Sequence, residues 1–159
     1  MRITKLSILL ILALTIMLSG CLNDSNTSQE GSNLIDLTSI QQLDEALLSG
    51  PAIVMIGYDT CPSCIVMKPV MENVFMEYED VASVMYLNTR NTPALASQFG
   101  VGYVPDSFVI VDKVEGEYVY MRYDGTAITE RNNARFVGVV KEETVKNTLD
   151  YAIAAREQE

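Results

Sequence analysis

Two cysteines separated by two residues are the part of this chain best suited to chemistry. They are Cys61 and Cys64, in the sequence Cys-Pro-Ser-Cys. Two thiols at this spacing can pass between a dithiol and a disulfide, and one of them can attack a mixed disulfide that the other forms with a substrate. The spacing therefore predicts a redox switch.

The segments on either side of the pair predict where it lies. Residues 52–57 form an apolar run typical of a buried strand, and residues 65–78 have the pattern of a helix. Pro62 suits a first helical position, where a missing N–H loses no partner. Free N–H groups and the positive end of the helix dipole stabilise an anion there, so we expect Cys61 to ionise readily and act as nucleophile. Cys64 lies on the same helical face and is expected to resolve the mixed disulfide.

Other uses of the cysteine pair are less favoured. A structural disulfide would close a loop of only a few residues, and the stabilisation by a disulfide grows with loop length. A closed four-ligand zinc site needs more ligands, and the chain has no histidine and no second CxxC pair. Transient binding of Cu(I) by two soft sulfurs stays an alternative. We expect no metal and no cofactor apart from the redox-active disulfide.

The N-terminus has the features of an export signal. Arg2 and Lys5 precede an apolar run over residues 6–18, and the sequence Leu-Ser-Gly-Cys then ends at Cys21. These four residues resemble the lipobox of bacterial and archaeal lipoproteins, which are cleaved before a cysteine that carries a diacylglyceryl group. The resemblance implies a signal peptide over residues 1–20, lipidation of Cys21 and a place at the extracytoplasmic face of a membrane. An uncleaved membrane anchor is disfavoured, because a spanning helix needs about 20 apolar residues and the run over residues 6–18 is shorter.

The rest of the chain divides into a tether and one domain. Residues 21–33 are rich in Ser, Asn and Gly, which predicts a lipid-anchored flexible linker. Residues 34–159 are numerous enough to build a core of their own. The net charge of −10 falls to −12 when the two basic residues of the signal peptide leave. Such acidity disfavours nucleic acid and anionic lipid headgroups as partners, so the lipid rather than charge would hold the protein at the membrane.

Periodicity along residues 34–159 predicts alternating helices and strands. The expected strands are 34–37, 52–57, 82–87, 107–111, 118–123 and 135–140, and the expected helices are 39–48, 65–78, a short one ending at 99, and 142–156. Pro69 predicts either a kink in its helix or an error in that assignment. Early alternation followed by neighbouring strands indicates an α/β fold with a mixed sheet covered on both faces. The segment 113–133 is longer than a simple hairpin needs, so it is an extended hairpin, a partner-contacting edge or an ordinary loop.

In order and spacing, these features resemble the thioredoxin superfamily over nearly all of residues 34–156. The CxxC motif follows a buried strand, and Pro69 lies at the offset of the family's kink proline. Residues 99–105 resemble the loop that ends in a cis-proline beside the cysteines, and residues 136–141 resemble the last strand with its glycine. The resemblance implies a thioredoxin-like three-layer fold, in which helices flank a mixed central sheet.

The resemblance also implies a function and a substrate site. It implies a thiol–disulfide oxidoreductase that acts on protein thiols and disulfides and exchanges electrons with a membrane redox partner. It implies that the Val104–Pro105 bond is cis and that the Val104 backbone pairs with an extended substrate chain. We expect a monomer. The direction of electron flow stays open, and the competing class is a binding module without turnover, either a Cu(I) carrier or a docking domain.

Three departures from the family distinguish this chain from cytosolic thioredoxins. Thioredoxins place a buried aspartate six residues before the first cysteine, and here that residue is Met55. The position of its usual lysine partner is occupied by Tyr86, and the position of the tryptophan before the first cysteine by Thr60. The residues that move the resolving proton in the family are therefore absent.

Two acids flank the expected site. Asp59 lies two residues before Cys61, and Asp106 directly follows Pro105. Acids near a thiolate disfavour its ionisation and repel acidic substrates. Both are candidates for tuning Cys61, and Asp106 could instead replace the missing proton carrier. The alternative for Asp106 is an exposed loop carboxylate.

Overall fold

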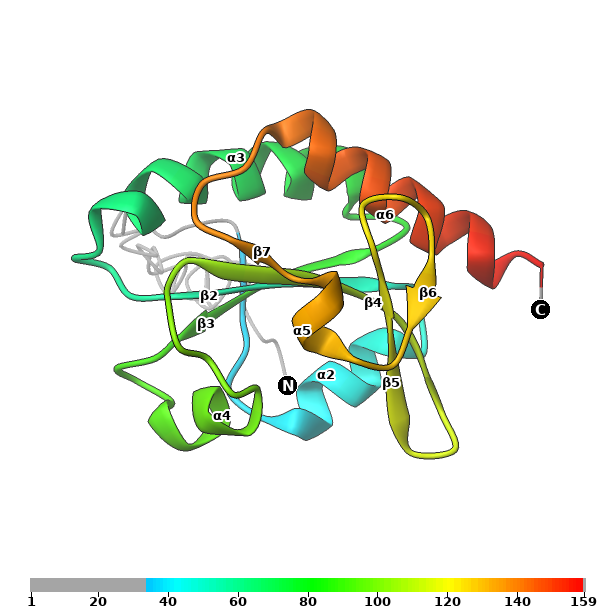
Figure 1. The fold of residues 1–159 in the computed structure, drawn as a ribbon, viewed down its shortest axis with the longest axis horizontal. Helices are drawn as coiled ribbons and strands as arrows, with labels where there is room; N and C mark the ends of the chain where they lie inside the picture. Colours follow the sequence, from blue (N-terminus) through cyan, green and yellow to red (C-terminus); the bar gives the residue numbers. More distant parts are fainter. Residues whose placement is uncertain (1–33, 159) are drawn as a thin grey trace, which may run out of the picture. The chain divides into compact units, whose positions relative to one another are not determined.

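The structure, a computed structural model, describes residues 34–158, which form one sheet between two layers of helices (Figure 1). The expected signal peptide, linker and lipidated Cys21 lie outside the described residues. In chain order the elements are β1 (Ile35–Asp36), α2 (Ile40–Leu47), β2 (Ala52–Gly57), α3 (Pro62–Tyr78), β3 (Ser83–Asn88), α4 (Pro93–Gln98), β4 (Asp106–Val114), β5 (Glu117–Met121), β6 (Ala127–Ile128), α5 (Arg131–Ala134), β7 (Phe136–Val137) and α6 (Glu142–Arg156).

The sheet is mixed, as the sequence predicts. Its strands lie in the order β1-β3-β2-β4-β5-β6, and β7 pairs with β4. The neighbours β1, β3 and β2 run parallel, whereas β4 joins β2 antiparallel and β5 and β6 continue as antiparallel neighbours. Parallel neighbours require crossover connections, and α2 and α3 supply them. The fold class expected from the sequence is therefore confirmed.

Side chains of the central strand β2 alternate between two hydrophobic cores. Ile53 and Met55 face the layer of α3 and α6, and Val54 and Ile56 face the layer of α2 and α4. The two helical layers lie on opposite sides of the sheet (Figure 1). Burial on both faces explains why β2 reads as a continuous apolar run. No helix within residues 34–158 has the length and apolar content needed to cross a membrane.

Helix α3 carries the second cysteine into the first of these cores. Its inward face is formed by Cys64, Met67 and Met71, followed by Val74 and Tyr78. Pro69 lies inside the helix and does not end it. The helix assignment made from the sequence is therefore right, and the alternative that Pro69 marks an error is wrong.

The predicted strand over residues 135–140 is wrong in length. Only β7 forms there, because Gly138 has a φ of +88° that turns the backbone out of the sheet. The N–H of Gly138 then donates to the carbonyl oxygen of Pro105 at 2.8 Å. This bond ties the C-terminal part of the chain to the segment that precedes β4.

The segment 113–133 forms a hairpin extended by two short elements. It turns at Glu115 and Gly116, which both have positive φ, and continues into β6 and α5. Near the tip, Lys113 and the Tyr118 hydroxyl each donate to Asp44 of α2 at 2.7 Å. The hairpin is thus fixed to the helical layer beneath it.

Candidate redox site

Cys61 and Cys64 lie at the junction of β2 and α3, where the sequence places them. Cys61 is the residue directly before the helix, and its Sγ accepts the backbone N–H of Cys64 at 3.3 Å. Both are free thiols, and both are buried, with 4% and 3% of their surface exposed. The N-terminal end of α3 thus supplies a hydrogen-bond donor to the sulfur of Cys61.

The second thiol is held in its protonated form. Burial, followed by the hydrogen bond with Cys61, raises the pKa of Cys64 to about 12. Desolvation disfavours a thiolate that has no compensating charge nearby. Exchange must therefore begin at Cys61, and Cys64 reacts only after it gives up a proton.

Val104 and Pro105 lie against the first cysteine. Their peptide bond is cis, as the family resemblance implies, and Val104 O lies 3.9 Å from Cys61 Sγ. Pro105 is in turn held by the hydrogen bond from Gly138. The loop before β4 thus contacts Cys61 on one side and is held by the residue after β7 on the other.

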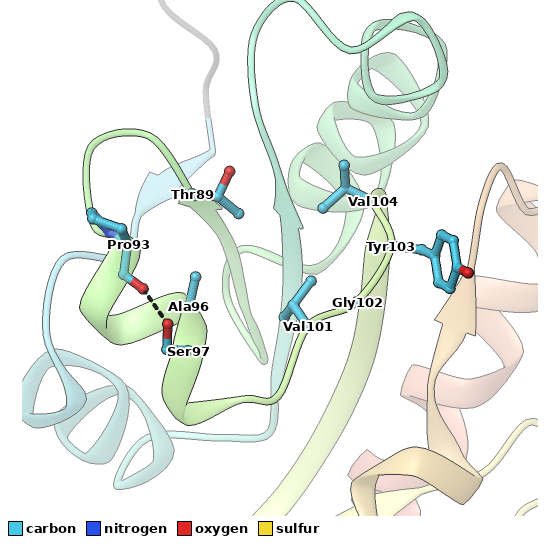
Figure 2. A pocket seen from close by; sticks show the side chains of 8 residues that line it. All are labelled: Thr89, Pro93, Ala96, Ser97, Val101, Gly102, Tyr103 and Val104. Atoms are coloured by element: carbon cyan, nitrogen blue, oxygen red, sulfur yellow. Dashed lines mark hydrogen bonds between the residues drawn. The ribbon is translucent and has the colours of Figure 1, made fainter.

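A shallow pocket of about 310 Å³ adjoins this loop. Its lining comes from α4 and from the residues before Pro105: Thr89, Pro93, Ala96, Ser97, Val101, Gly102, Tyr103 and Val104 (Figure 2). The Tyr103 ring projects away from the other labelled side chains, and 75% of that residue is exposed (Figure 2). The pocket and the exposed ring give the loop two apolar contact surfaces beside Cys61.

Asp59 belongs to a polar cluster at the edge of the site. Its carboxylate accepts hydrogen bonds from Asn88 Nδ2 at 2.9 Å and from the Tyr86 hydroxyl at 3.5 Å. Lys68 Nζ lies 3.6 Å from the same carboxylate and 4.7 Å from the centre of the Tyr86 ring. Asp59 was predicted as a site residue from the sequence, but Lys68 was not. Its spacing was the available signal, because Lys68 follows Cys64 by four residues and so lies one helical turn further along the same face.

The positions that depart from the thioredoxin pattern lie where the resemblance puts them. Met55 is fully buried and stands opposite Tyr86 in the parallel register of β2 and β3. Tyr86 is 3% exposed, and burial followed by the negative charge of Asp59 raises its pKa above the ordinary value. Thr60 is exposed beside Cys61. An apolar side chain and a neutral phenol therefore fill the space under the cysteines.

Asp106 is engaged elsewhere. It is fully buried, and its two carboxylate oxygens accept hydrogen bonds from Arg131 at 2.9 Å and Arg135 at 2.8 Å. Arg131 also stacks over Phe108, which belongs to the α2 and α4 core, whereas the cysteines belong to the α3 and α6 core. The alternative of an exposed loop carboxylate is wrong. The tuning of Cys61 by Asp106 or Asp59 stays a prediction.

A metal centre has no ready set of ligands in this part of the chain. Within residues 34–158, no group of three or more His, Cys, Asp or Glu side chains is placed to hold a metal ion. Each cysteine has its nearest polar partners in the backbone or in the other cysteine. The described site offers thiol chemistry.

Comparison with known proteins assigns this arrangement to a family. The family model "Thioredoxin" matches residues 36–148. The chain is 27% identical over 115 residues to thioredoxin 1 of Synechococcus elongatus, covering 72% of this chain and 90% of that one. It is 31% identical over 71 residues to thioredoxin of Synechocystis sp., covering 42% of this chain and 66% of the relative.

Solved structures share the fold at lower identity. A mutant thioredoxin from Halobacterium salinarum superposes with a TM-score of 0.56 at 22% identity, covering 75% of this chain and 89% of the other. Chloroplastic thioredoxin z superposes with a TM-score of 0.57 at 17% identity, covering 76% and 95%. At such identities the likeness concerns the fold alone.

Proposed function

We propose, because this chain belongs to the thioredoxin family, that it is a membrane-tethered thiol–disulfide oxidoreductase working outside the cytoplasm. Thiol–disulfide exchange on protein substrates is what the family does, and the chain shares it at that level. The observation that carries the proposal is the position of Cys61. Its sulfur caps α3 through the Cys64 N–H at 3.3 Å and faces Val104 O at 3.9 Å.

In the first step, the Cys61 thiolate attacks one sulfur of a substrate disulfide. A bond forms between Cys61 Sγ and that sulfur, the substrate S–S bond breaks, and the other substrate sulfur leaves as a thiolate. The helix end stabilises the attacking anion. Cys64 stays protonated because its pKa is raised to about 12, so it does not compete for the substrate.

In the second step, Cys64 gives up its proton and its sulfur attacks Cys61 Sγ. The Cys61–Cys64 bond forms, and the substrate leaves as its second thiolate. Two electrons have then passed from the protein dithiol to the substrate disulfide. Dithiol exchange with a redox partner at the membrane restores the reduced pair, and no other cofactor takes part.

The substrate chain binds along Val104 and the adjoining pocket. An extended peptide can pair with the backbone of Val104, in the manner of a strand added to a sheet edge. Pro105 carries no N–H, so it does not compete with Val104 for the carbonyl oxygens of the substrate chain. The exposed Tyr103 ring and the pocket of about 310 Å³ beside it supply apolar contacts for neighbouring substrate side chains.

The place of action is proposed from the N-terminal sequence. The run from Arg2 to Cys21 has the layout of a lipoprotein signal, and residues 22–33 have the composition of a tether. The net charge of −12 after cleavage gives the domain no electrostatic affinity for an anionic membrane. Attachment would therefore depend on the lipid at Cys21.

Reduction of insulin with dithiothreitol as electron source tests the proposal. The full chain should accelerate precipitation of the insulin B chain, Cys61→Ser should abolish the effect, and Cys64→Ser should accumulate a mixed disulfide visible on a non-reducing gel. Stoichiometric retention of Cu(I) without any acceleration would instead identify a binding module. The reduction potential of the pair then gives the direction of electron flow, since family values range from about −270 mV for reductants to about −120 mV for oxidants.

A further inference from the structure

The fate of the Cys64 proton is not explained by the two cysteines themselves. Only 3% of Cys64 is exposed, so water has little access to its sulfur. On the sheet beneath it, the neighbouring positions Met55 and Ser107 carry no charge. A proton acceptor for Cys64 must therefore be reached from another side.

The Tyr86 ring lies across a small space from the sulfur. A Cβ placed on Gly57 would lie 2.9 Å from Cys64 Sγ and 3.4 Å from Tyr86 Cε2. The sulfur and the edge of the phenol ring thus border the same small space, which exists because residue 57 has no side chain. The phenol is a neutral group that can accept one hydrogen bond and donate another.

The Tyr86 hydroxyl leads from this space to a carboxylate at the surface. It donates to Asp59 Oδ1 at 3.5 Å, and 64% of the Asp59 side chain is exposed. Asn88 donates to the other oxygen at 2.9 Å, and Lys68 Nζ lies 3.6 Å from Oδ1. These two groups hold the carboxylate in place.

The arginine of the turn after β3 acts elsewhere. Arg90 stacks on the Tyr58 ring at 4.6 Å. Cys61 is the sulfur under attack and carries no negative charge in the mixed disulfide. Asp59 is therefore the carboxylate to which the Tyr86 hydroxyl is joined.

We propose that Tyr86 and Asp59 form the proton path of the resolving step, with Lys68 and Asn88 as the residues that position Asp59. This inference rests on the proposed function and adds residues to it. The path joins a buried thiol to a solvent-exposed carboxylate through one phenol. The path begins at Tyr86, which lies opposite Met55, the residue that stands where thioredoxins have their buried aspartate.

The proposed step balances as follows. The proton on Cys64 Sγ passes to the Tyr86 oxygen while the Tyr86 proton passes to Asp59, so the phenol ends neutral and the carboxylate ends protonated. The electron pair left on Cys64 Sγ forms the bond to Cys61 Sγ. The substrate sulfur leaves with the electron pair of the broken bond, and Asp59 releases its proton to water.

Stopped-flow reaction of the reduced full chain with dithiobis(nitrobenzoate) separates the two steps. Attack by Cys61 releases a first nitrothiobenzoate, and attack by Cys64 on the mixed disulfide releases a second. We expect Tyr86→Phe to leave the first phase unchanged. Both Tyr86→Phe and Asp59→Asn should slow the second phase about 100-fold at pH 7, a typical loss for a missing general base. The slowed phase should then regain about tenfold for each pH unit, because hydroxide replaces the lost acceptor.

Tyr78→Phe is the matched control. Tyr78 is a buried tyrosine of α3 whose hydroxyl donates to Asp150 at 2.8 Å, away from the cysteines. It should leave both phases and their pH dependence unchanged. A second phase of wild-type rate and pH dependence in both Tyr86→Phe and Asp59→Asn would overturn the proton path. A wild-type chain that releases no second nitrothiobenzoate at any pH would overturn the proposed function as well.

Discussion

Asp106 and Arg131 form a buried ion pair, 2.9 Å apart, between residues separated by 25 positions in the sequence. Arg135 occupies the second carboxylate oxygen at 2.8 Å. Two guanidinium groups thus compensate one fully buried carboxylate. The pairing fixes the chain immediately after Val104 and Pro105 to the segment around α5.

Asp106→Asn should lower the free energy of unfolding by about 3 kcal/mol, because it leaves the buried Arg131 and the partly buried Arg135 without their counter-charge. Urea unfolding measures the loss. Asp112→Asn is the control, since Asp112 pairs with Arg156 at 3.7 Å on a partly exposed surface and such pairs contribute about 1 kcal/mol or less.

The same Asp106 variant tests the tuning of Cys61. A displaced pH profile of Cys61 alkylation by iodoacetamide would support tuning by Asp106, and an unchanged profile would contradict it.

Gly57→Ala should disturb the cysteine site directly. The added methyl would lie 2.9 Å from Cys64 Sγ, closer than real contacts allow, with Cys64 Cβ at 3.3 Å and Tyr86 Cε2 at 3.4 Å. We expect a loss of about 1–3 kcal/mol in unfolding free energy, typical of an overpacked core, and a slower second phase with dithiobis(nitrobenzoate). Gly102→Ala is the control, because a Cβ there meets nothing within 4 Å. Equal stability of the two variants would contradict the contact.

Alkaline pH should weaken the fold through its buried phenols. Burial and the hydrogen bond to Asp150 raise the pKa of Tyr78 from 10.0 to about 12. A group whose pKa is raised on folding contributes its full stability below its unfolded pKa and loses it as pH rises through its folded pKa. Stability should therefore fall between about pH 10 and 12, by about 2 kcal/mol from Tyr78. Urea unfolding at pH 9 and pH 11.5 should show a smaller fall for Tyr78→Phe, and an equal fall would contradict the assignment.

Cys21→Ala should release the protein from the membrane, if the proposed lipid is its attachment. Fractionation of expressing cells should move the chain from the membrane pellet towards the soluble fraction, and the intact protein should lose the mass of the lipid. Cys61→Ser is the control, because it removes a cysteine without touching the signal. Retention of Cys21→Ala in the membrane with an uncleaved N-terminus would favour the anchor alternative.

The local parts of the fold could be predicted from the sequence because their signals are local. Strand β2 has the predicted bounds, since an apolar run between Pro51 and the CxxC motif leaves little choice of ends. Helix α6 likewise begins and ends at the predicted residues. The position of Cys61 before α3 follows from Pro62 at a helix start.

The parts that escaped prediction depend on contacts between distant residues. Asp106 looks like a loop residue beside Pro105, and only its pairing with Ile56 and Val137 draws it into β4. Its partners Arg131 and Arg135 lie 25 and 29 positions away, so no periodic pattern in the sequence predicts the pairing. The contact of Tyr86 with Asp59 escaped for the same reason, as it spans 27 positions between a strand and a loop. For the pairing of Asp106, the available signal was the presence of Arg131 and Arg135, two arginines four residues apart in a strongly acidic chain.

The hydrogen bond from Gly138 to Pro105 also separates the redox site from the tip of the hairpin. It fixes both ends of the interval that contains the exposed turn at Glu115 and Gly116. Lengthening a loop whose ends are already fixed costs free energy that grows only with the logarithm of its length. A peptide tag or fluorescent label inserted at that turn would therefore leave the spacing of Cys61 and Val104 intact, and the protein could be immobilised or followed during turnover through a part of the chain that takes no share in it.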